Sequence, residues 1–118
     1  MSNSTFQHGL MLYLHITVDP SRIDEYLEHL QPIHKAVSAE PDCALFTVSV
    51  NRETGEIRMT QSWNRDREWF SEVQAKKAYY EPFIAATKSM WTKPRVVEVQ
   101  ERLGSQWEFQ KVTNFEGA

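Results

Sequence analysis

The sequence predicts an α+β domain whose elements follow the order β, α, β, β, α, β. Residues 10–18 alternate with the two-residue period of a strand, and residues 21–37 repeat at helical spacing. A glycine-containing turn then joins two further alternating segments. The chain has 118 residues, which is the length of one domain with a single core.

The first strand is expected over residues 10–18. Aliphatic side chains at every second position alternate there with a set of mixed polarity, Met11, Tyr13, His15 and Thr17. Because this second set is only half polar, we expect both faces of the strand to be buried.

A helix is expected directly after this strand. Asp19 suits the N-cap, and Pro20 suits the first helical position, where its missing N–H costs nothing. Hydrophobic residues recur at helical spacing over residues 23–37, with Tyr26 at the edge of the stripe. Pro32 lies inside this pattern, so we expect it to kink the helix or to restart it for a final turn.

Two strands joined by a tight turn are expected next, over residues 43–50 and 56–63. The turn between them contains Gly55, which is able to take a positive φ. Strands joined by so few residues are antiparallel neighbours.

A second helical region is expected between Asn64, which can cap it, and Pro94, which ends it. Glu81 and Pro82 resemble a second helix start within this region. Residues 95–103 then predict the last strand, because valines alternate with polar residues along it.

This order of elements predicts the ferredoxin-like fold. Two right-handed β-α-β crossovers around an antiparallel hairpin give a four-stranded antiparallel sheet with both helices on one face. Because the first strand is apolar on both sides, the open face is expected to pair with the sheet of a second copy, giving a homodimer.

The domain is expected over residues 10–103, between a flexible N-terminus (1–9) and a C-terminal tail (104–118). This tail is too aromatic for a disordered end. We expect it to dock on the partner subunit or over a pocket mouth through Trp107, Phe109 and Phe115.

Composition excludes several classes of partner. Thirteen Lys and Arg against sixteen Asp and Glu give a net charge of −3 without a basic stripe, which argues against nucleic acid. No apolar run reaches the roughly 20 residues of a membrane span. Residues 1–7 are polar and lack a basic leader region, and the single Cys43 forms no internal disulfide. We therefore expect a cytoplasmic protein.

The aromatic content favours a bound flat ligand. Fourteen aromatic residues are more than a small core of average composition holds. Any one of them alone is best interpreted as core packing, but together they favour a pocket for a small aromatic substrate. Seven of them lie on predicted faces between sheet and helices: Phe46, Trp63, Trp69, Phe70, Tyr80, Phe83 and Trp91.

Four segments carry a resemblance to a known family. They are LHITV at 14–18, EPDCALF at 40–46, SW at 62–63 and AYY at 78–80. Together they resemble the antibiotic biosynthesis monooxygenase-like family of dimeric α+β barrels, over about residues 10–103. The resemblance implies a homodimer and supports Trp63 as a site residue.

The same resemblance implies an activity. The better characterised oxygenases of the family act on anthrone-like polycyclic phenols without metal, flavin or haem. For this chain it implies a cofactor-free monooxygenase of an aromatic polyketide or similar phenol in secondary metabolism. Other members oxidise quinols, cleave haem or have no settled reaction.

Such chemistry needs a base, because the phenol or anthrone must lose a proton before its carbanion can reduce dioxygen. His34 falls on the apolar stripe of its helix and is one candidate, although a backbone carbonyl could satisfy it instead. His15 is the other, and it faces either the pocket or the subunit interface. His29 and His8 are expected at the surface.

Family members often carry two histidines that are missing here, at positions occupied by Glu72-Val73 and Tyr79-Tyr80. Mechanisms that rely on those histidines do not transfer to this chain. Arg95 is expected either to reach a substrate oxygen or to form a surface ion pair.

No metal site is expected, since His29 and His34 point about 140° apart on their helix. Two rival functions stay open beside oxygenation. One is a cyclase, dehydratase, decarboxylase or isomerase on a similar substrate, which needs only proton transfer. The other is a dimer that binds a small aromatic without turning it over. Haem degradation is a weaker option, because it requires an axial histidine.

Overall fold

The computed structural model describes residues 8–111. Four strands and three α-helices follow one another in the predicted order. The strands are β1 (Leu10–Thr17), β2 (Cys43–Asn51), β3 (Glu56–Trp63) and β4 (Val96–Glu101). The helices are α1 (Ile23–Ser38), α2 (Arg67–Glu72) and α3 (Tyr80–Thr87).

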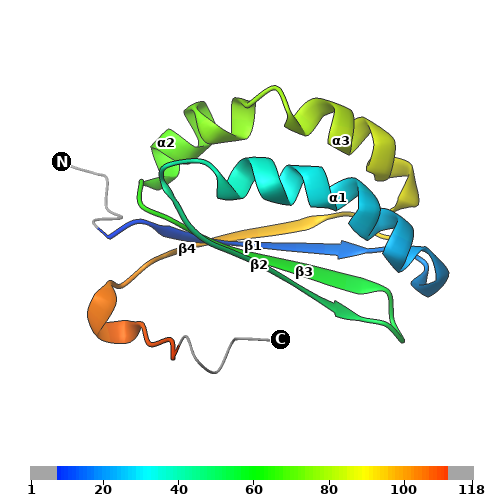
Figure 1. Cartoon of the computed structure of the whole chain (residues 1–118), viewed down its shortest axis with the longest axis horizontal. Coiled ribbons are helices and arrows are strands. Elements are labelled where there is room, and N and C mark those ends of the chain that lie inside the picture. The colour runs from blue at the N-terminus through cyan, green and yellow to red at the C-terminus, as the bar shows by residue number, and fades with distance from the viewer. Residues whose placement is uncertain (1–7, 112–118) are drawn as a thin grey trace.

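The four strands form one sheet in the order β2-β3-β1-β4, with every neighbouring pair antiparallel. All three helices cover the same face of this sheet, and residues 102–111, which follow β4, run on the opposite side (Figure 1). This arrangement is the ferredoxin-like α+β fold, so the predicted fold class is confirmed.

Alternation along β1 decides what faces the helices. Leu14 pairs with Met59 on β3 and Val97 on β4, and this set faces the helices. Tyr13 and His15 face the other side, where both are half-buried within the single chain. The second copy expected over that open face stays a prediction.

Helix α1 begins after a single 3-10 turn, Pro20–Arg22, and runs through Pro32 without a break. Asp19 caps this turn, because its carboxylate accepts a hydrogen bond from the Ser21 backbone N–H at 2.9 Å. Of the two outcomes predicted at Pro32, a kink or a restart, the restart is wrong. Pro32 lies on the exposed side of the helix, where water can bond the carbonyl that loses its N–H partner.

The cap of α2 differs from the prediction. Asp66, and not Asn64, caps the helix, accepting a hydrogen bond from the Trp69 backbone N–H at 2.9 Å. The side-chain oxygen of Asn64 instead accepts a hydrogen bond from Arg102 at 2.7 Å. Helix α3 begins at Tyr80, close to the second start predicted from Glu81 and Pro82.

Gly55 connects the β2–β3 turn to the end of β1. Its φ is 83°, and a Cβ there would lie 1.8 Å from the Val18 carbonyl oxygen, so only glycine fits. Val18 donates its backbone N–H to the Gly55 oxygen at 3.0 Å and bridges to Trp91 on its other side. Thr92 adds a backbone bond to the Thr17 oxygen at 2.8 Å.

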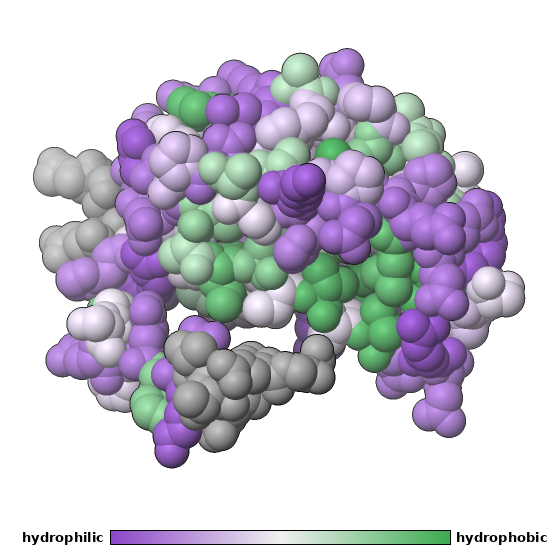
Figure 2. All heavy atoms as spheres, in the orientation of Figure 1, coloured by the Kyte–Doolittle hydropathy of each residue, from purple (hydrophilic) through white to green (hydrophobic). Residues whose placement is uncertain are grey.

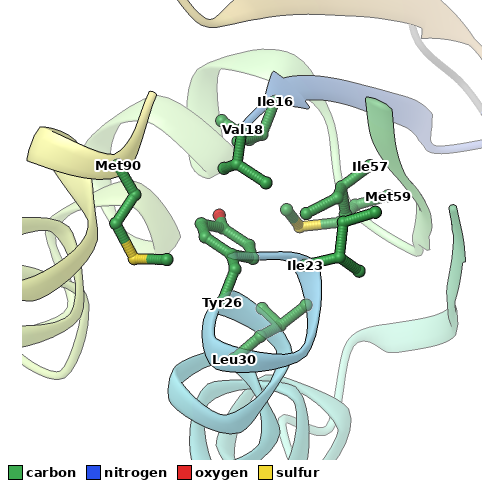
Figure 3. Close-up of a cluster of buried hydrophobic side chains, with 8 residues drawn as sticks. All are labelled: Ile16, Val18, Ile23, Tyr26, Leu30, Ile57, Met59 and Met90. Atoms are coloured by element: carbon green, nitrogen blue, oxygen red, sulfur yellow. The ribbon is translucent and has the colours of Figure 1, made fainter. Parts of the chain in front are cut away.

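Two clusters of buried side chains lie between the sheet and the helices. One, around Tyr26, fills the space between α1 and the sheet (Figure 3). The other surrounds Trp63 near the start of α2 and includes Leu10, Leu12 and Val37. In Figure 2, hydrophobic side chains form a band across the middle of the visible face, where the helix layer meets the sheet.

The described chain after β4 contains one 3-10 turn, Ser105–Trp107. Trp107 is 70% exposed and Phe109 is 86% exposed, so neither side chain joins the core of its own chain. Phe115 and residues 1–7 lie outside the described residues, and docking of the tail stays a prediction. Within residues 8–111, no helix has both the length and the apolar character needed to cross a membrane.

Candidate active site

Two adjoining cavities lie between the helices and the sheet. The outer cavity, between α2, α3 and strands β1 and β4, has a volume of about 330 Å³. The inner cavity, between α1, α3 and the sheet, has about 70 Å³. Pockets that hold small molecules begin at about 300 Å³, so of these two cavities the outer one is large enough for a substrate. The two share wall residues, namely Leu14, Gln61, Tyr80, Ile84 and Arg95.

Most of the predicted aromatic residues line these cavities. Phe46, Phe83 and Trp91 line the inner cavity, Phe70 lines the outer one, and Tyr80 lines both. The outer cavity, where an aromatic ring system would lie, therefore has two aromatic walls, Phe70 and Tyr80, and the other three rings surround the inner cavity.

Trp63 and Trp69 lie behind this wall and line neither cavity. Trp63 is fully buried, and its ring centroid lies 5.5 Å from that of Phe70 and 5.9 Å from that of Trp69. The two tryptophans thus support Phe70, whose ring reaches the outer cavity.

Gln61 is a wall residue that sequence reasoning missed. It is only 3% exposed, and its Oε1 accepts a hydrogen bond from Trp63 Nε1 at 2.8 Å. Its Nε2 has no acceptor among residues 8–111, so an N–H donor is available where the two cavities meet. The sequence did carry a signal for it, because the alternation along β3 places Gln61 on the same buried face as Met59 and Trp63, where a polar side chain is unusual.

Arg95 supplies a positive charge to the same wall. Its guanidinium carbon lies 5.4 Å from the centroid of the Trp91 ring. No carboxylate among residues 8–111 lies within ion-pair distance of it, so the expected surface ion pair is not formed in the described part of the chain. An unpaired guanidinium beside an apolar cavity attracts an anionic oxygen.

Tyr26 contributes a hydroxyl to the inner cavity. The residue is 1% exposed, and its ring meets Phe83 edge-on with centroids 5.8 Å apart. No group within residues 8–111 accepts a hydrogen bond from its hydroxyl. Burial raises the pKa of Tyr26, although the positive charge of Arg95 partly opposes this. The hydroxyl therefore stays protonated at neutral pH and is a donor.

A buried polar network holds the Tyr80 ring against both cavities. Gln74 is fully buried, and its Nε2 donates to the hydroxyl oxygens of Tyr79 at 2.8 Å and Tyr80 at 3.0 Å. Tyr79 in turn donates to Glu40 Oε2 at 2.6 Å. Burial raises the pKa of both tyrosines. Gln74 also escaped prediction, since its only signal is an amide in a short helical segment.

The two histidines predicted as bases lie away from the cavity walls. His34 Nε2 is 3.0 Å from the Phe46 carbonyl oxygen, and its ring centroid is 4.5 Å from that of Phe46. His15 lies on the open face of the sheet, with Nε2 3.2 Å from Glu98 Oε1. His29 is exposed, as the helical spacing predicts.

Cys43 is half-buried at the start of β2. Its thiol donates to the Leu45 carbonyl at 3.6 Å, and burial raises the pKa of the thiol, which disfavours the nucleophilic thiolate. No three His, Cys, Asp or Glu side chains within residues 8–111 are grouped as metal ligands.

The chain is similar to known proteins both in sequence and in structure. No family model matches the chain. A protein of Pestalotiopsis microspora named a putative monooxygenase is 35% identical over 101 residues, which cover 84% of each chain. A solved putative antibiotic biosynthesis monooxygenase from Caulobacter crescentus superposes with a TM-score of 0.74 at 16% identity, covering 84% of this chain and 93% of that one.

A second solved protein, a putative antibiotic biosynthesis monooxygenase from Nitrosomonas europaea, gives a TM-score of 0.73 at 13% identity. It covers 86% of this chain, and 96% of its own length is matched. The two solved structures show the fold, and the relative from Pestalotiopsis microspora shows the family. The chain belongs to the antibiotic biosynthesis monooxygenase family.

Proposed function

We propose that this protein is a cofactor-independent monooxygenase of an aromatic polyketide or other anthrone-like phenol, acting as a cytoplasmic homodimer in secondary metabolism. Family membership and the monooxygenase-named relative support a monooxygenase-like role in general. One observation carries the finer proposal. The apolar outer cavity is bounded on one wall by the free Gln61 amide N–H and the unpaired Arg95 guanidinium.

These two groups suit an ionised phenol. With its rings between Phe70 and Leu14, a phenol would direct its oxygen toward Gln61 and Arg95. A positive charge and an N–H donor stabilise the phenolate more than the neutral phenol, so they lower the pKa of the bound phenol. The proton leaves to water at the mouth of the cavity, beside Val97, which is 47% exposed.

The reaction then needs only the substrate and dioxygen. The methylene carbon of an anthrone loses a proton, and the resulting carbanion forms a C–O bond with dioxygen, which becomes a peroxide anion. This anion takes up one proton to give a hydroperoxide. Loss of water then leaves a carbonyl at that carbon, so one oxygen atom enters the product and the other leaves as water. The protein contributes charge stabilisation and orientation.

The remaining predicted site residues enter this proposal indirectly. Trp63 positions Gln61 through its 2.8 Å hydrogen bond. His34 positions Phe46, whose carbonyl and ring it contacts. His15, on the open face, contributes to the contact with the second copy.

The test measures oxygen consumption by metal-stripped protein mixed with an anthrone. We expect one dioxygen consumed per substrate and one atom of isotopic oxygen in the product. Arg95→Gln should slow the reaction, whereas Arg52→Gln, which removes an exposed guanidinium paired with Asp24 at 3.1 Å, should not. Consumption no faster than autoxidation for several such substrates would refute the proposal.

A second candidate is a proton-transfer enzyme, such as a cyclase, dehydratase, decarboxylase or isomerase. The same observation favours it, because Gln61 and Arg95 would stabilise any enolate, with or without dioxygen. Turnover that persists without oxygen would identify this function. Tight binding with the ligand recovered unchanged would instead identify a binding protein.

A further inference from the structure

The inner cavity is too small for the ring system that the outer cavity would hold. An apolar cavity of about 150 Å³ holds one benzene molecule or xenon. The inner cavity has about 70 Å³, so it fits a guest smaller than one aromatic ring. The walls that belong to it alone are mostly aliphatic or aromatic, among them Ile16, Leu30 and Phe83. Such a space favours a small apolar molecule over a charged one.

Two hydrogen-bond donors at this cavity lack partners. Figure 3 shows the Tyr26 ring projecting from α1 into its cluster, between Met90 and Met59, with the hydroxyl at the end far from the helix. That hydroxyl has no acceptor within residues 8–111. Trp91 lines the same cavity, and its indole N–H is buried with no acceptor in that range either. Buried donors without an acceptor suit a guest that is apolar when it enters and becomes a hydrogen-bond acceptor during the reaction.

We propose that the inner cavity is a dioxygen site, from which dioxygen meets a substrate ring in the outer cavity across their shared wall, and that the Tyr26 hydroxyl hydrogen-bonds the oxygen as it gains negative charge. This inference rests on the proposed function, because dioxygen serves a purpose there only beside an oxidisable substrate. Dioxygen is apolar and enters without losing strong hydration. Once the substrate carbanion has bonded to it, the distal oxygen carries the negative charge, and the walls of the inner cavity include Tyr26 as a donor and Arg95 as a cation for that charge.

The site can be tested without turnover, because dioxygen is paramagnetic. Methyl-labelled protein is placed under oxygen pressure, and methyl relaxation is compared with the same sample under nitrogen. We expect selective enhancement at Ile16, Leu30 and Met59, which line the inner cavity. Leu10 and Ile57 are equally buried but line neither cavity, so they report the general background. Enhancement that is equal at all five methyl-bearing residues would overturn the site.

Filling the cavity gives the second test. Ile33→Phe adds volume at a residue that lines only the inner cavity, and Leu27→Phe adds similar volume to the same helix at a residue that does not line it. We expect Ile33→Phe to abolish the selective relaxation and to raise KM for dioxygen about tenfold, with the Kd for the aromatic substrate unchanged. Equal effects of the two variants would mean that overpacking, and not the cavity, is responsible.

Tyr26→Phe separates binding from chemistry. It removes the hydroxyl but keeps the ring, so the oxygen-induced relaxation should persist while kcat falls about tenfold. An unchanged kcat would remove Tyr26 from the proposal. If no substrate is oxidised but the selective relaxation is present, the proposed function fails and the gas site stands. If oxidation occurs without selective relaxation, the site fails alone.

Discussion

Trp63 Nε1 donates a hydrogen bond of 2.8 Å to Gln61 Oε1, and this bond leaves the Gln61 amide N–H as the group available to the cavities. An amide side chain carries a donor end and an acceptor end, and a fixed partner for one end determines which is left for a ligand. Trp63 therefore affects the site by orienting Gln61, although Trp63 itself lines neither cavity.

Replacing Gln61 by leucine should weaken the binding of ionised phenols about ten- to a hundredfold. A hydrogen bond to a charged group contributes about 1.5–3 kcal/mol, and the variant loses that donor while keeping most of the side-chain volume. Calorimetric titration with a phenol and with its oxygen-free ring analogue separates the two contributions. Equal losses for both ligands would mean that Gln61 acts through packing alone.

Trp63→Phe should reduce both stability and phenol affinity. The variant leaves a void in the core and removes the donor to Gln61, which together lower the free energy of unfolding by about 2 kcal/mol or more. Urea denaturation measures the stability, and calorimetric titration measures the affinity. Lower stability with unchanged affinity would show that the hydrogen bond does not orient Gln61.

Arg95→Gln should raise the pKa of a bound phenol by about one unit, because it removes the nearby positive charge. A nitrophenol reports this directly, since its anion is coloured and the bound form can be titrated by absorbance. Arg95 is exposed, so its stability contribution should stay within about 0.5 kcal/mol. Arg52→Gln is the matched control, and the same shift in both variants would exclude a local effect of Arg95.

His15→Gln and His34→Gln should each leave turnover within about threefold of the wild-type rate. Neither imidazole lines a cavity, and glutamine at position 34 can still donate to the Phe46 carbonyl. The pH profile of kcat is the measurement. A loss of about a hundredfold or more, together with a changed profile, would identify that histidine as the base.

Stability should fall above about pH 10, and Tyr26→Phe should flatten that fall. Burial raises the pKa of Tyr26 above its ordinary value of 10.0, so the folded chain keeps a proton that the unfolded chain loses. The stabilisation is complete below pH 10 and is lost as the pH rises toward the folded pKa, by about 1.4 kcal/mol per pH unit for one tyrosine. Urea denaturation from pH 8 to 11 checks this, and identical slopes for both proteins would contradict it.

Light scattering should give a mass of twice the 13.8 kDa of the chain. Tyr13→Arg places a charge on the open face of the sheet and should return the mass to that of one chain, whereas His29→Arg, on the exposed side of α1, should not. A single-chain mass for the wild-type protein would refute the predicted homodimer.

The fold was predictable because its signals are local. The alternation along β1, the glycine turn after β2 and the spacing in α1 each depend on a few neighbouring residues. The restart at Pro32 and the cap at Asn64 failed because the tertiary environment of each residue, and not its local sequence, decided the outcome. Solvent exposure accommodates the first, and Arg102 binds the second.

Only the general character of the site, an aromatic cavity, could be predicted, because the prediction came from the amino-acid composition. The aromatic residues point to a cavity, but no local pattern shows that Phe70 forms its wall while Trp63 stands behind it. Gln61 and Gln74 escaped prediction because an amide in an inward position gains its meaning from partners distant in space. The helical spacing predicted Tyr26 at the edge of a stripe. It could not predict that its hydroxyl is free, because this depends on the absence of a hydrogen-bond acceptor from α3 and β1, which are distant in sequence.

Gly55 is hydrogen-bonded to Val18, and Val18 forms a β-bridge to Trp91. The hairpin turn at one end of the sheet therefore positions Trp91, a wall residue of the inner cavity. Any side chain at position 55 would push the Val18 backbone away, and the bridge to Trp91 would move with it. A random mutational screen for lost activity would therefore score Gly55 as if it touched the substrate. In directed evolution toward larger substrates, substitutions in the same turn would change the shape of the cavity without altering any residue that lines it.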